Sequence, residues 1–155
     1  MKISDCMKRK VIYSTPETTI QDAAKLLVQY HIGSLPIVNE ENHLVGLLHI
    51  RDFVTLAMPD FVNLLENLDF IHDFGAVENE IPNTEVLGKP VKDIMREPLF
   101  VESSAGLLRA AALLQEHRLY DLPVVDEERR LVGIASYVDI GIAVLSSWNK
   151  TEGTS

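Results

Sequence analysis

The sequence predicts an α+β protein made of two copies of one strand–helix–strand–strand–helix unit. The main observation is an internal repeat: "SLPIVNEENHLVGLLHIRD" (34–52) aligns with "DLPVVDEERRLVGIASYVD" (121–139) at an offset of 87 residues. Farther upstream, Met7 aligns with Met95 at an offset of 88. Because one such unit is too small to bury both faces of its sheet, we expect the two to pack with their sheets inside, related by a pseudo-two-fold axis.

A short strand and an amphipathic helix are expected at the start of each unit. Residues 11–13 and 99–101 are short apolar stretches that are typical of strands. Apolar residues then recur at helical spacing after Thr19, whose hydroxyl can cap a helix that has Asp22 in its first turn. Gly33 follows this helix and suits the left-handed conformation of a C-terminal cap.

A hairpin and a second helix complete each unit. In the first copy, apolar stretches at 34–38 and 43–50 flank the polar turn 39–42, which predicts two antiparallel strands. The second helix is expected to begin near Arg51 in the first copy and near Val138 in the second.

The repeat divides the chain into two units and two other segments. The units are expected at residues 1–59 and 89–148, with an insert at 60–88 and a tail at 149–155.

The insert between the units contains a periodic apolar stretch. Apolar residues over 61–74 fall on one helical face, which predicts a helix that ends near Gly75. The rest of the insert is interpreted as a linker.

Composition and charge exclude several classes of function. The formal net charge is −9, so nucleic-acid binding would need a basic patch, and the short run "KRK" (8–10) is interpreted as solvated surface. No stretch approaches the ~18 apolar residues of a membrane span, and the N-terminus does not resemble a signal peptide. Cys6 is the only cysteine, which excludes an internal disulfide. Together these features predict a cytoplasmic protein.

The sequence offers no catalytic or metal-binding pattern. The five histidines lack the spacing of common metal sites, and no nucleophile–base pair or glycine-rich phosphate loop is present. We therefore expect a binding protein that is not an enzyme and holds no metal.

Each copy resembles a CBS domain, the module named after cystathionine β-synthase. The resemblance rests on an "LP[IV]V" strand, a polar turn, "LVG", and a motif of glycine, apolar residue, any residue, Ser or Thr, two residues and Asp. This motif reads "GLLHIRD" at 46–52 and "GIASYVD" at 133–139. A stand-alone pair of such domains implies a regulatory module that senses AMP, ADP or ATP.

The resemblance also implies a binding site at the second motif. Asp139 would accept hydrogen bonds from both ribose hydroxyls, and Ser136 would donate to a phosphate near the start of a helix. The structural alternative is that Asp139 only caps its helix.

An adenine pocket is implied beside this motif. Its expected residues come from the entrance of the first strand and from the residues around the start of the "LP" strand, and they are Ile94, Leu99, Leu119, Tyr120 and Asp121. Tyr120 can stack on the base or serve as a half-buried core residue.

The first motif departs from the family pattern. It keeps Asp52 but carries His49 where the second motif has Ser136, and Gly33 stands where Tyr120 stands. His49 and Asp52 are therefore expected either to form a second site or, through His49, to contact the phosphates of a nucleotide held by Asp139. A histidine hydrogen-bonded within the interface is the alternative.

The favoured function is a sensor that alters an unidentified partner protein through its shape. No cofactor is required, and the adenine nucleotide is a regulatory ligand. A ligand-free dimerisation scaffold and an S-adenosylmethionine sensor are the alternatives. A homodimer is expected through the apolar helices that start near Arg51 and Val138.

Overall fold

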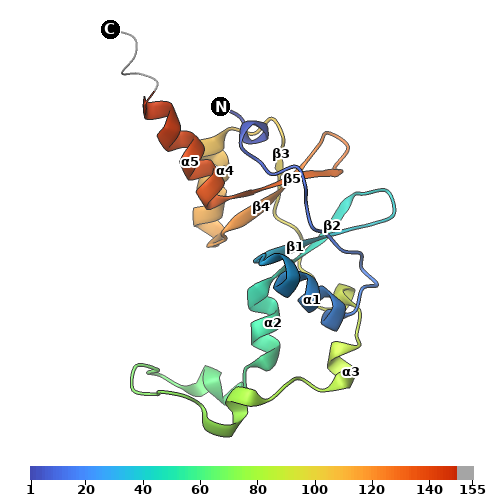
Figure 1. The fold of residues 1–155 in the computed structure, drawn as a ribbon, viewed down its shortest axis with the longest axis vertical. Coiled ribbons are helices and arrows are strands. Elements are labelled where there is room, and N and C mark those ends of the chain that lie inside the picture. The colour runs from blue at the N-terminus through green and yellow to red at the C-terminus, as the bar shows by residue number, and fades with distance from the viewer. Residues whose placement is uncertain (150–155) are drawn as a thin grey trace.

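Two antiparallel hairpins form the centre of the molecule. The computed structural model describes residues 1–149, and the tail expected at 149–155 lies outside them except for its first residue. Strand β1 (Ser34–Val38) pairs with β2 (Leu44–His49). Strand β4 (Asp121–Val125) pairs with β5 (Leu131–Ser136), and the two-residue β3 (Val101–Glu102) joins β4 in parallel. The predicted α+β class and the two repeated units are confirmed, with the hairpins facing each other across the middle (Figure 1).

The two hairpins have the same register at the 87-residue offset. Ser34 pairs with His49 as Asp121 pairs with Ser136, and in both hairpins the register shifts after the fourth residue pair. Backbone hydrogen bonds also join the tips of the two hairpins. The repeat in sequence is therefore a repeat in structure.

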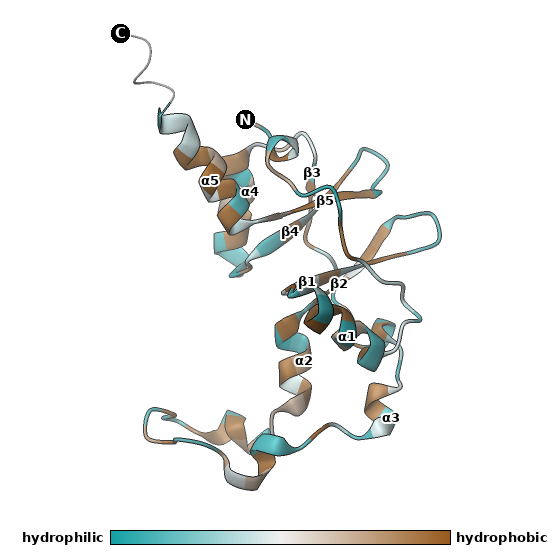
Figure 2. Ribbon diagram, in the orientation of Figure 1, coloured by the Kyte–Doolittle hydropathy of each residue, from teal (hydrophilic) through white to brown (hydrophobic). Residues whose placement is uncertain are grey.

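Helices cover the outside of both hairpins. The first unit has α1 (Ile20–Tyr30) and α2 (Ile50–Ala57), and the second has α4 (Leu107–His117) and α5 (Tyr137–Trp148). Thr19 caps α1 as predicted, because its hydroxyl accepts a hydrogen bond from the Asp22 backbone. Figure 2 shows hydrophobic residues along much of α2 and α5 as well as in the hairpins.

The left-handed residue after α1 is His31, not Gly33. His31 has φ 51°, and its counterpart Arg118 after α4 has φ 54°. Gly33 already belongs to the extended chain, because its carbonyl accepts a hydrogen bond from the Ile50 backbone at 2.8 Å. The prediction for Gly33 was wrong because α1 ends two residues earlier, at the left-handed cap His31.

The opening segment of each repeat packs on the other unit. The backbones of Lys8 and Ile134 exchange two hydrogen bonds, at 2.8 and 2.9 Å. Arg96 and Leu47 do the same at 3.0 and 3.1 Å. Each unit is therefore completed by the opening segment of the other repeat.

Two methionines explain the glycines of the "LVG" sequences. A Cβ placed on Gly133 would lie 2.5 Å from the Sδ of Met7, and one placed on Gly46 would meet Met95. Met7 is buried together with Ile3 in the core of the second unit. Each glycine therefore leaves room for the methionine that arrives from the other repeat.

The first predicted strand is absent from the first unit. Residues 11–13 form no strand, and only Ser14 makes an isolated parallel bridge, to Ile37. In the second unit the strand begins at Val101, where 99–101 was predicted. The reason is that each segment crosses from one sheet to the other, so most of its residues have no continuous strand beside them.

The predicted helix at 61–74 is also wrong. The insert holds only two short 3-10 helices, Asp60–Leu64 and Gly75–Asn79, and the short helix α3 (Thr84–Leu87). The carboxamide of Asn67 and the carboxylate of Asp73 accept hydrogen bonds from backbone groups two residues later, at 2.9 and 2.8 Å. Such local bonds compete with helical hydrogen bonding.

Gly133→Ala should destabilise the protein, because the added methyl group displaces Met7 in a packed core. We expect a loss of about 1–3 kcal/mol in the free energy of unfolding, measured by urea denaturation. In a Met7→Ala background the additional cost of Gly133→Ala should be smaller, because the clashing sulfur is gone and only the close contact of the added Cβ with the Lys8 carbonyl, at 3.1 Å, remains.

Gly141→Ala is the matched control. Gly141 lies in α5 with open space around its Cα, so this change should be neutral or stabilising by up to about 1 kcal/mol. Equal costs of Gly133→Ala with and without Met7 would contradict the proposed packing.

Candidate functional site

A cavity of about 200 Å³, lined by both charged and apolar residues, lies beside the start of α5. It is bounded by residues 8–12, which we call the crossing segment, and by the end of α1, β1 and the second motif. The lining residues are Lys8, Lys10, Val11, Ile12, His31, Ile32, Gly33, Ser34, Asp121, Ile134, Ser136 and Asp139. Both repeats therefore contribute to one cavity, which we call the Asp139 cavity.

Asp139 and Ser136 cap α5 reciprocally. The Ser136 hydroxyl accepts a hydrogen bond from the Asp139 backbone at 2.9 Å, and one carboxylate oxygen of Asp139, Oδ2, accepts one from the Ser136 backbone at 3.0 Å. The capping role is thus present. It holds the carboxylate in one orientation at the cavity wall, where the helix N-terminus also favours a bound anion.

Two lysines bring positive charge to the Asp139 cavity. The ammonium group of Lys8 lies 3.8 Å from Asp139, and Lys10 lines the same cavity. The basic run at 8–10 was interpreted as solvated surface, and all three residues are exposed. Although the Lys8 side chain is 67% exposed, the crossing segment carries it to the cavity.

The rest of the wall is mainly apolar. Val11 and Ile12 come from the crossing segment, Ile32 follows α1, and Ile134 lies in β5. The cavity thus combines apolar side chains with two lysines and two carboxylates, those of Asp121 and Asp139, and such a lining can bind a ligand that has both an apolar part and charged groups.

Ser34 and Asp121 occupy equivalent positions of the two repeats and meet each other. The Ser34 hydroxyl donates to the Asp121 carboxylate at 2.6 Å. Burial raises the pKa of Asp121, and the hydrogen bond from Ser34 opposes this rise. Asp121 lines both the Asp139 cavity and a second, smaller cavity.

The smaller cavity, of about 110 Å³, contains several residues that were expected around the nucleotide. Its lining residues are Gly33, His49, Ile50, Arg51, Leu119, Tyr120 and Asp121. Leu119 and Tyr120 thus line the cavity that contains His49 and not the Asp139 cavity, although the Tyr120 carbonyl accepts a hydrogen bond from the Tyr137 backbone of the second motif. Tyr120 is 81% exposed, which excludes the reading of a half-buried core residue.

Two further residues of the expected adenine pocket line neither cavity. Ile94 packs against the core of the first unit and Leu99 against that of the second. The residues of the first repeat that are equivalent to Leu99, Leu119 and Tyr120 are Val11, Ile32 and Gly33. These three residues do line the Asp139 cavity, because the opening segments of the two repeats cross. Applying the repeat offset to the expected pocket would have found them.

His49 lines the smaller cavity and is not among the residues that line the Asp139 cavity, so its contact with a phosphate held at Asp139 stays a prediction. The Nε2 atom of His49 is buried and has no hydrogen-bond partner within residues 1–149, and Nδ1 lies 3.9 Å from Asp52. Burial is the main cause that lowers the pKa of His49, although Asp52 and Asp121 oppose it.

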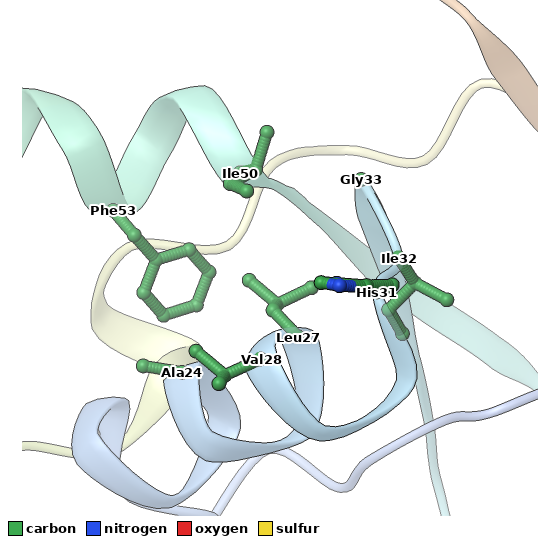
Figure 3. A pocket seen from close by; sticks show the side chains of 8 residues that line it. All are labelled: Ala24, Leu27, Val28, His31, Ile32, Gly33, Ile50 and Phe53. Atoms are coloured by element: carbon green, nitrogen blue, oxygen red, sulfur yellow. The ribbon is translucent and has the colours of Figure 1, made fainter.

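An apolar groove of about 500 Å³ lies between α1 and α2. Figure 3 shows Ile50 and Phe53 of α2 facing the side chains of α1. The lining residues are Ala24, Leu27, Val28, His31, Ile32, Gly33, Ile50 and Phe53. This groove offers a surface for apolar contact, and it shares the segment 31–33 with the Asp139 cavity.

The structure adds two observations on other classes of site. Across residues 1–149, no three His, Cys, Asp or Glu side chains are grouped so that they could hold a metal ion. Within the same residues, no helix has the length and apolar character needed to cross a membrane.

Comparison with known proteins identifies the family. The CBS domain family matches residues 3–58 and 91–145, so the chain belongs to this family, as a pair of CBS domains. It is 35% identical over 137 residues to the CBS domain-containing protein CBSX1, chloroplastic, of Arabidopsis thaliana, covering 84% of this chain and 57% of that protein. The chain thus spans little more than half the length of this relative.

Solved structures with the same fold contain adenine compounds. A crystal structure of CBSX2 in complex with AMP matches with a TM-score of 0.71 and 30% identity, covering 94% of this chain and 96% of that one. The CBS domain pair of protein MJ0100, in complex with 5′-methylthioadenosine and S-adenosyl-L-methionine, matches with a TM-score of 0.68 over 95% and 98% of the two chains. At 22% identity, this second likeness shows the fold alone.

His49→Ser should make the protein less sensitive to mild acid. A histidine whose folded pKa is lowered takes up its proton first in the unfolded chain. Above the ordinary pKa of 6.5, His49 is neutral in both states and does not change the free energy of unfolding. As the pH falls from 6.5 toward the lower pKa of the folded state, the unfolded chain binds the proton more tightly, so the folded state loses stability. Urea unfolding at pH 7.5 and 5.5 should show a smaller loss in the variant than in the parent.

His43→Ser is the control for this measurement, because the His43 side chain is 37% exposed and lines neither cavity, so the variant should lose as much stability between the two pH values as the parent. An unchanged difference between the two pH values in His49→Ser would contradict the prediction.

Proposed function

We propose that this chain is a regulatory module, without catalytic activity of its own, that binds an adenine nucleotide in the Asp139 cavity. The observation that carries the proposal is the composition of this one cavity. A helix-start carboxylate and hydroxyl, two lysines and an apolar wall converge there from both repeats.

Each group has a role that matches a part of the nucleotide. Asp139 accepts hydrogen bonds from the two ribose hydroxyls, since a carboxylate has enough acceptor sites for both. Lys8 and Lys10 bind the phosphates together with the Ser136 hydroxyl, which accepts the Asp139 backbone bond and can still donate its own proton. Val11 and Ile32 pack against the adenine ring.

The lysines favour a phosphate-bearing ligand. AMP, ADP and ATP carry negative charge that Lys8 and Lys10 stabilise, whereas the sulfonium group of S-adenosylmethionine is positive. The S-adenosylmethionine sensor is therefore the weaker alternative. The CBSX2 complex with AMP, at 30% identity, supports the same choice.

Regulation would pass through the segment 31–33. This segment lines both the Asp139 cavity and the apolar groove between α1 and α2. A nucleotide in the cavity and a protein on the groove would contact the same backbone, so each would change the affinity for the other. The regulated partner is unidentified, and the cytoplasm stays the proposed location, although the relative CBSX1 is chloroplastic.

The module also forms a homodimer in this proposal. The support is the apolar surface of α2 and α5, where Ile50, Val54, Val138, Ile142 and Leu145 are each at least 48% exposed. Burial of these side chains against a second copy would remove them from water. If the chain binds no nucleotide, this dimer would remain as the ligand-free scaffold.

Ile142→Glu should convert the dimer into a monomer, because it puts a charge in the centre of the apolar face of α5. Light scattering at micromolar concentration should give about twice the chain mass for the parent and one chain mass for the variant. Leu108→Glu, on the exposed face of α4, is the matched control and should leave the dimer intact. A monomeric parent would refute this part of the proposal.

Asp139→Ala should weaken nucleotide binding at least about tenfold. It removes two charge-assisted hydrogen bonds to the ribose, each worth about 1.5–3 kcal/mol, while stability falls only by about 1 kcal/mol for the lost cap. Isothermal titration with ATP and with adenosine measures the loss of affinity, and the comparison of the two ligands separates the contribution of the ribose from that of the phosphates. The parent should prefer ATP, and salt should reduce this preference because it screens the lysines.

Asp52→Ala is the matched control for this titration, since Asp52 is the equivalent residue of the first repeat and should affect binding much less. If Asp139→Ala binds ATP as tightly as the parent does, the ribose site is elsewhere. A parent that binds no adenine compound at millimolar concentration would overturn the nucleotide proposal.

A further inference from the structure

The two motif aspartates meet different basic residues. At Asp52, Oδ1 accepts hydrogen bonds from Nε of Arg96, at 2.8 Å, and from Nη2 of the same guanidinium. Its Oδ2 accepts the backbone hydrogen bond of His49 at 2.9 Å. Both oxygens are therefore occupied, and the Asp52 side chain is only 8% exposed.

Asp139 is more open than Asp52. Its Oδ2 accepts the backbone hydrogen bond of Ser136, and Lys8 approaches only to 3.8 Å. Its Oδ1 accepts no hydrogen bond within the described part of the chain. The Asp139 side chain is 20% exposed and lines a cavity about twice as large as the one at His49.

The difference follows from the chemistry of the two cations. A guanidinium presents several N–H donors in a planar fork, and here two of them bind one carboxylate oxygen. An ammonium group is a compact charge that can remain solvated near a carboxylate. A ribose arriving at Asp52 would replace charged donors with neutral hydroxyl donors, which is unfavourable for a nearly buried carboxylate.

We propose that Arg96 is an internal latch that occupies the ribose-binding carboxylate of the first motif. Each chain therefore binds one nucleotide, at Asp139. Because Arg96 and Lys8 are equivalent at the 88-residue offset, the single site results from a difference between two residues in the same structural position. This inference rests on the proposed nucleotide function.

Binding stoichiometry tests the latch directly. Isothermal titration of the parent with ATP should give one ATP per chain. The double variant Arg96→Lys/His49→Ser gives the first motif the lysine and the serine that the second motif has, and it should bind two ATP per chain. With Asp139→Ala added, the double variant should retain one site, whereas Asp139→Ala alone should lose the only one.

The outcomes separate the latch from the nucleotide function. Two ATP per parent chain would overturn the latch and leave the nucleotide proposal standing. A folded double variant that still binds one ATP would show that Arg96 is not what closes the first motif. No binding by the parent would refute the nucleotide function itself. The parent stoichiometry needs no variant, so it tests the latch even if the double variant does not fold.

Discussion

The reciprocal crossing of the two opening segments is the constraint on which the rest of the structure depends. Lys8 bonds to Ile134 of the second unit, and Arg96 bonds to Leu47 of the first. These backbone bonds place Met7 on Gly133 and Met95 on Gly46, so each core is completed by the other repeat. The Asp139 cavity exists only because this crossing carries residues 8–12 of the first repeat to the motif of the second.

The helix cap at the second motif also orients the carboxylate of the proposed binding site. The reciprocal cap between Ser136 and Asp139 satisfies backbone donors at the start of α5 and fixes the direction of the carboxylate. A side chain that is already oriented loses little conformational freedom when a ligand arrives. Lys8 and Lys10 supply local positive charge in a chain whose net charge is −9, so the charge at this cavity depends on tertiary placement and not on overall charge.

Small differences between the repeats break the symmetry of the molecule. The hairpins keep the same register, yet Ser34 stands opposite Asp121 on the pseudo-axis, and His49 replaces Ser136. His49 and Asp121 are partly buried. Burial lowers the pKa of His49 and raises that of Asp121, because it disfavours the charged form of each side chain. The two cavities therefore differ in size and in the charged residues that line them, although they come from equivalent segments.

The sequence by itself determined the repeated units, the hairpins, the cap at Thr19 and the motif residues Ser136 and Asp139. These features depend on local periodicity, turn residues and capping, and each of these signals involves only residues that are close together in the sequence. The periodicity of 61–74 wrongly predicted a helix, because side-chain hydrogen bonds of Asn67 and Asp73 to the backbone compete there with helical hydrogen bonds. Only the tertiary structure decided which residues face each motif, since the crossing joins Val11 and Lys8 to Asp139 and leaves Tyr120 beside His49. Such a pairing depends on packing between distant segments, because the buried methionines and glycines must fit each other, and no local pattern encodes that fit.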